Sequence, residues 1–152
     1  MKHSKWFGFL VFALALLLLS GANAQMDSAA AVVFTASLSG DNVVPAVSTD
    51  ASGTAVAVLK GNLLVVGGTY EGLSSDIAVE IRGGFHIHQG AAGENGGIVF
   101  EVGNDGGTAG TFSGAFVLTD EQMTALKDGL FYLQLHTANN KPGELRGQLS
   151  MQ

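Results

Sequence analysis

TAVAVLKGNLLVVGGTY, residues 54–70, is the stretch that decides the fold. Small and apolar side chains alternate along Thr54–Lys60, Gly61-Asn62 has the composition of a tight turn, and Leu63–Tyr70 continues as a second apolar strand. Two such strands joined by two turn residues predict a β-hairpin. Successive side chains of a strand point to opposite faces, so one face of this hairpin is expected to face a core.

Short strands separated by glycine-rich turns recur along the rest of the chain. We expect them at Val33–Leu38, Ile77–Ile81, Phe85–His88, Ile98–Val102, Thr111–Leu118, Leu130–His136 and Glu144–Met151. About eight strands and many glycines predict an all-β fold, an antiparallel Greek-key β-sandwich or flattened barrel.

One segment departs from the strand pattern. Thr119-Asp120-Glu121-Gln122 has the form of a capping box, and Gly129 is a typical residue after a helix C-terminus. The sequence therefore predicts one short helix over Asp120–Asp128.

Three histidines lie on two of the expected strands. In Phe85–His88, His86 and His88 leave from one face and the two apolar residues from the other. In Leu130–His136, His136 likewise lies on the face opposite Leu133 and Leu135. If these strands are neighbours, three imidazoles meet on one sheet surface, away from the core, and can bind a metal ion.

The ligand types narrow the choice of metal. The chain has no cysteine, and three imidazoles without thiolate suit copper(II) or zinc, with copper favoured by the affinity order where it is available. Ring nitrogens that do not bind the ion need hydrogen-bond partners. The candidates are Glu101, Glu144 and backbone carbonyls. The alternative is that His86 and His88 are ordinary surface residues and that His136 makes a hydrogen bond at its strand end.

Other polar features have simpler interpretations. Glu144 and Arg146 lie two residues apart, and we favour a cross-strand ion pair over an interpretation in which Arg146 guides an anion to the metal. The segment Gly90–Gly97 lacks the lysine and the helix of a phosphate-binding loop, and we expect a flexible loop at the rim of the site. No catalytic nucleophile arrangement is present.

The first residues predict a signal peptide. Lys2 and Lys5 precede an apolar run over 6–19 that is shorter than the ~20 residues needed to span a bilayer. Ala22 and Ala24 then form an A-x-A cleavage pair. We therefore expect a signal peptide at 1–24, a leader at 25–31, one domain at 32–152, and a secreted or periplasmic protein that has no membrane segment after cleavage.

Charge limits the partners of the mature chain. Residues 25–152 contain five Lys and Arg against thirteen Asp and Glu, a formal charge of about −8 with neutral histidines. No basic patch is present, so nucleic acid is not an expected partner. The expected partner is a metal ion, with an extracellular protein as a second candidate.

Several motifs follow one another in a specific order along the chain. They are Phe34–Gly40, Val44-Pro45, Gly53–Ala55, His86–Gly96, Leu118-Thr119, His136-Thr137 and Gly143–Leu149, which together cover nearly all of residues 32–152. Taken together in this order, they resemble the chordin-type (CHRD) domain family. The resemblance implies a β-sandwich of the immunoglobulin-like or superoxide-dismutase-like kind, found in exported bacterial proteins, and no settled activity.

A second resemblance is confined to the histidine strand. Gly84–His88 is similar to the strand that carries two copper ligands in copper-zinc superoxide dismutase, and His136 and Arg146 would correspond to a further ligand and a substrate-guiding arginine. The chain has no equivalent of the bridging histidine, the zinc ligands or the disulfide of that family.

Three functions follow as hypotheses. The first is a metal-binding module that holds copper or zinc through His86, His88 and His136. The second is a copper redox enzyme of the superoxide-dismutase-like type, and the third is an extracellular structural or interaction domain without metal.

Overall fold

The described part of the chain is built almost entirely from β-strands. The computed structural model describes residues 30–152, so the expected signal peptide and residues 25–29 of the expected leader lie outside the described residues. The strands are β1 (Val32–Ser39), β2 (Ser52–Lys60), β3 (Leu63–Glu71), β4 (Phe85–Gln89), β5 (Gly97–Glu101), β6 (Gly103–Asn104), β7 (Gly110–Val117), β8 (Phe131–Leu135), β9 (Leu145–Gln148) and β10 (Ser150–Met151).

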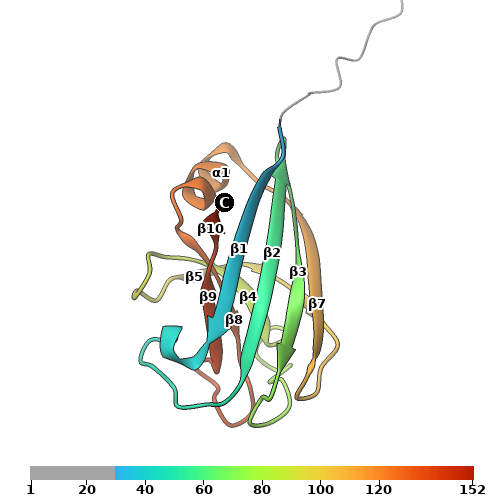
Figure 1. Cartoon of the computed structure of the whole chain (residues 1–152), viewed down its shortest axis with the longest axis vertical. Helices are drawn as coiled ribbons and strands as arrows, with labels where there is room; N and C mark the ends of the chain where they lie inside the picture. The colour runs from blue at the N-terminus through green and yellow to red at the C-terminus, as the bar shows by residue number, and fades with distance from the viewer. Residues whose placement is uncertain (1–29) are drawn as a thin grey trace, which may run out of the picture.

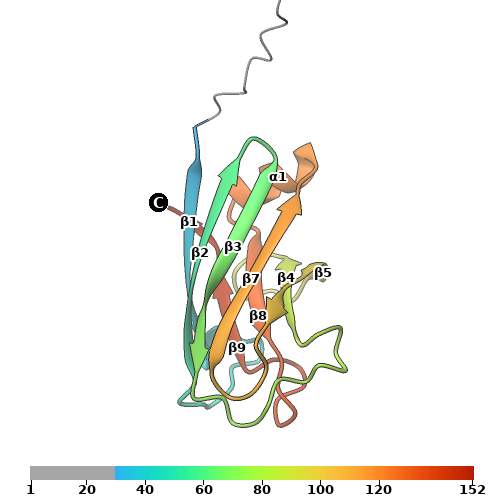
Figure 2. The same ribbon diagram turned by 90° about the vertical axis from the view of Figure 1, so that its right-hand side faces the viewer.

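These strands form a single antiparallel sheet that curls over itself. Their order is β5-β4-β8-β9-β1-β2-β3-β7-β6, and β10 also pairs with β1. The long strands β1, β2, β3 and β7 form one layer, and β4, β5, β8 and β9 lie behind it (Figures 1 and 2). The predicted all-β antiparallel fold with one short helix is confirmed.

The core lies between the two layers and follows the predicted alternation. In the confirmed hairpin of β2 and β3, Ala55, Ala57 and Leu59 are buried whereas Val56 is 52% exposed. Gly61 at the turn has a φ of 58°, the left-handed region that glycine adopts without steric penalty. From the other layer, β4 and β8 contribute buried apolar side chains, including Phe85, Ile87, Leu133 and Leu135.

Two expected strands differ in the structure. Residues 77–81 are not a strand, because only Ile77 forms an isolated bridge, to Thr137, before the chain enters turns. The expected strand Glu144–Met151 is divided into β9 and β10 by Leu149. The sequence pattern also missed the short strand β6 and a 3-10 turn, η1 (Gly40–Asn42).

The predicted helix is present as α1 (Asp120–Lys127), and its capping box is complete. The Thr119 hydroxyl accepts from the Gln122 amide at 3.2 Å, and the Thr119 amide donates to Gln122 Oε1 at 2.9 Å. Gly129 has a φ of 72°, in agreement with its expected place after the helix. Within residues 30–152 no helix has both the length and the apolar character to cross a bilayer.

The capping box at Thr119 is expected to stabilise the folded protein. Thr119→Ala removes the acceptor for the Gln122 amide and is expected to lower the free energy of unfolding by about 1 kcal/mol in a urea titration. The control is Thr108→Ala, because Thr108 is exposed and a surface substitution of this kind changes stability by less than about 0.5 kcal/mol. Equal effects of the two variants would contradict a role for the cap.

Candidate metal centre

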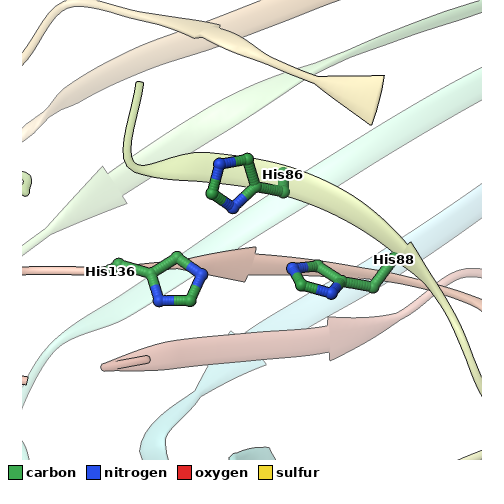
Figure 3. A group of neighbouring side chains, drawn as sticks. All are labelled: His86, His88 and His136. Atoms are coloured by element: carbon green, nitrogen blue, oxygen red, sulfur yellow. The ribbon is translucent and has the colours of Figure 1, made fainter. Parts of the chain in front are cut away.

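The three predicted histidines come together on the face of the sheet opposite the core. Strands β4 and β8 are neighbours, as the prediction required, and His86 pairs directly with Gln134. His136 follows β8 and remains in line with it, because its amide donates to the Gly84 carbonyl at 2.8 Å. Figure 3 shows the His86 and His88 rings from β4 and the His136 ring from the end of β8 turned toward one space.

The cluster is compact and buried. One ring nitrogen from each histidine lies within 4.8 Å of the others, and the ring centroids are 5.1–6.1 Å apart. His86 is 0%, His88 7% and His136 6% exposed. The expectation of a surface site is therefore wrong: the rings lie on the outer face of the sheet, but loops cover them.

Each histidine is oriented by a backbone carbonyl from a different loop. His86 Nε2 lies 2.9 Å from the Arg82 oxygen, His88 Nδ1 3.0 Å from the Gly96 oxygen, and His136 Nδ1 2.7 Å from the Lys141 oxygen. A carbonyl can only accept, so each of these nitrogens carries the hydrogen. The other nitrogen of each neutral ring therefore has a free lone pair.

Those free nitrogens are the ones without partners. Within residues 30–152, the buried side-chain nitrogen and oxygen atoms that lack a hydrogen-bond partner are His86 Nδ1, His88 Nε2, His136 Nε2 and Gln134 Oε1. Native proteins leave few such groups without a structural or functional reason. A cation coordinated by imidazole nitrogens is one such reason.

Burial favours the neutral form of two of the imidazoles, His88 and His136. It lowers the pKa of His136 to about 4, although the Lys141 carbonyl opposes this shift and His86 and His88 add to it. Burial likewise lowers the pKa of His88, against the Gly96 carbonyl and together with the electrostatic influence of His86 and Arg146. Protons therefore compete weakly for these nitrogens at neutral pH.

The turn before β4 is shaped to present a carbonyl to His86. Arg82, Gly83 and Gly84 have consecutive positive φ angles of 46°, 81° and 76°. A Cβ at position 84 would lie 2.3 Å from an Ile77 methyl, so only glycine fits there. The Arg82 side chain bonds Glu101 at 2.8 Å, so Glu101 is not the outer partner of a histidine, and the backbone-carbonyl alternative is the correct one.

Arg146 holds the loop that orients His88. Arg146 is 2% exposed, and its guanidinium donates to the Ala91 and Glu94 carbonyls at 3.0 and 2.8 Å. It also stacks on the Tyr132 ring, with 3.6 Å from its central carbon to the ring centroid. The same tyrosine stacks on His88 at 4.9 Å. The sequence did not single out Tyr132, although it shares the alternating face of His136.

Glu144 has a separate structural role. It is fully buried, and its carboxylate accepts from Thr49 Oγ1, from the amide and hydroxyl of Ser74, and from Thr137 Oγ1. Burial alone would raise its pKa, but these hydrogen bonds outweigh burial and the pKa is lowered. Glu144 is thus no outer partner of a histidine. The ion pairs within residues 30–152 are Arg82–Glu101 and Lys141–Glu80, so the expected pairing with Arg146 is wrong.

Comparison with known proteins identifies the domain type. The sequence matches the family model described as CHRD domain over residues 34–149, a span that includes all three histidines. Comparison with curated proteins and with solved structures finds no match. The likeness to copper-zinc superoxide dismutase therefore still rests on the histidine strand and the predicted positions of His136 and Arg146.

Proposed function

We propose, from the premise that the chain belongs to the CHRD domain family, that it is an exported domain that binds one copper or zinc ion through His86, His88 and His136. The observation that carries the proposal is the convergence of three lone-pair nitrogens that have no other partner. The basic start, the apolar run and the A-x-A pair of residues 2–24 support export.

The donor set fits these ions on chemical grounds. Neutral imidazole is a common ligand of both zinc and copper, whereas magnesium and calcium prefer oxygen. Backbone carbonyls fix the three tautomers before an ion arrives, so little reorganisation is needed on binding. Without a ligand, each buried nitrogen costs about 1–3 kcal/mol of lost hydration, and an ion removes all three penalties together.

Titration calorimetry on the purified, metal-free protein tests the proposal. We expect one Cu²⁺ or Zn²⁺ ion per chain near neutral pH. His88→Ala removes one ligand and is expected to weaken binding by at least about a hundredfold, the upper end of the effect of losing an outer-shell partner alone.

Phe116→Ala is the matched control, because it removes a ring of comparable size that stacks on Phe100, outside the cluster. This variant should bind the ion as tightly as the unaltered chain. The proposal is overturned if the unaltered protein takes up neither ion, or if His88→Ala binds equally well.

A further inference from the structure

The fourth unpartnered atom belongs to the same face of the sheet as the histidines. Gln134 pairs with His86 across β4 and β8 and precedes His136 by two residues, so the side chains share a face. Gln134 is 5% exposed, and its Oε1 atom is shielded from solvent without a hydrogen-bond partner. The sequence could have shown this residue, because it alternates with the leucines of β8 as His136 does.

The loop after β8 fixes the orientation of the Gln134 amide. Nε2 donates to the Pro142 carbonyl at 2.6 Å, and the preceding Lys141 carbonyl holds His136. Because a carbonyl only accepts, the amide nitrogen must face it, and the oxygen takes the opposite side. The Gln134 side chain can lie this close to the loop because residue 143 is a glycine. A Cβ at position 143 would lie 2.5 Å from Gln134 Nε2, too close for any other residue while Gln134 keeps this position.

The four unpartnered atoms, one from each histidine and Oε1 of Gln134, cannot form hydrogen bonds with one another. The three free ring nitrogens and the amide oxygen are all acceptors, and no hydrogen remains among them once the carbonyls are bonded. A single water supplies two hydrogens and would leave two acceptors unpaired. A cation bound by the three nitrogens, beside the residue that pairs with His86, would interact favourably with the lone pairs of all four atoms.

We infer that Gln134 Oε1 is the fourth ligand of the ion and closes its coordination sphere. This inference rests on the function proposed above and deepens it. Three imidazole nitrogens and one amide oxygen supply the four ligands that zinc takes in closed sites, whereas catalytic sites keep one position open. A tetrahedral zinc ion held by these four ligands would have no coordination position for a substrate, which favours the metal-binding module over an enzyme.

Azide provides the test, because it coordinates metal ions that have an open position. The Co²⁺-substituted protein is followed by visible absorption, because Co²⁺ can occupy the tetrahedral site of zinc, whereas Cu²⁺ with four ligands can still accept azide at an axial position. The unaltered protein should keep its spectrum when azide is added. Gln134→Ala should bind metal ten- to a hundredfold more weakly and change its spectrum with azide. Gln134→Glu, which restores an oxygen, should again be insensitive.

The control is Gln148→Ala, which deletes another partly buried amide of the same sheet. Gln148 bonds the Gly90 and Gly129 carbonyls, so this variant should behave as the unaltered protein does. The inference is overturned if the unaltered protein binds azide as readily as Gln134→Ala, or if Gln134→Ala keeps the original affinity and spectrum. The proposed function stands in either case, provided that His88→Ala weakens binding by at least about a hundredfold. Failure of the unaltered protein to bind metal overturns both.

Discussion

Zn²⁺ at about a hundred times its dissociation constant is expected to stabilise the folded protein by about 2.7 kcal/mol, because the proposed site exists in the folded chain and not in the unfolded one. For a domain of this size that increment raises Tm by roughly 10 °C. Thermal unfolding followed by circular dichroism, with and without the ion, measures it. A chelator should return Tm to its original value.

Two variants distinguish an effect of metal coordination on Tm from an effect of packing on Tm. His136→Ala removes one of the three converging nitrogens and should abolish the zinc-dependent rise in Tm. Phe116→Ala should lower Tm through lost packing but keep the rise. A rise that survives His136→Ala would show that zinc acts at another place on the chain.

Glu144→Ala is expected to lower the free energy of unfolding by about 3–5 kcal/mol. The carboxylate is fully buried and accepts four hydrogen bonds, from Thr49, Ser74 and Thr137. Hydrogen bonds to a charged group are worth roughly 1.5–3 kcal/mol each, and some of the freed hydroxyls can find other acceptors. Urea unfolding at neutral pH provides the measurement.

The same carboxylate makes stability depend on pH. Its pKa is lowered from the ordinary value of 4.5, so below pH 4.5 the unfolded chain binds more protons than the folded one. The stabilisation is present above pH 4.5 and is lost as pH falls through the lowered pKa of the folded state. Glu144→Gln keeps the size of the side chain and should remove this contribution. If the free energy of unfolding of Glu144→Gln falls with decreasing pH as steeply as that of the unaltered protein, Glu144 is not the source of this pH dependence.

Local patterns were sufficient to predict most of the strands and the shared face of the histidines. Alternation alone separates His86 and His88 from Phe85 and Ile87, and the capping box located the helix. The pairing of β4 with β8 was a condition that the sequence could not settle, because residues more than 40 positions apart form that contact.

The structure differs from the sequence-based predictions where tertiary contacts outweigh the local sequence pattern. Ile77 is buried, as its apolar character suggests, but the turn through Arg82 begins too early for a strand to form. Arg146 and Glu144 are close in sequence, yet each is satisfied by distant partners, loop carbonyls in one case and hydroxyl groups in the other. Burial of the histidines depends on three loops whose paths no periodicity describes.

The groups that orient the three histidines are main-chain carbonyls. The orientation of the imidazoles therefore does not depend on the side chains at those positions. Arg82 and Lys141 contribute their carbonyls to the histidines, while their side chains turn to Glu101 and Glu80 on the exterior. The side chains at positions 82 and 141 could therefore be replaced to change the surface charge around the cluster, while the backbone carbonyls continue to orient the imidazoles.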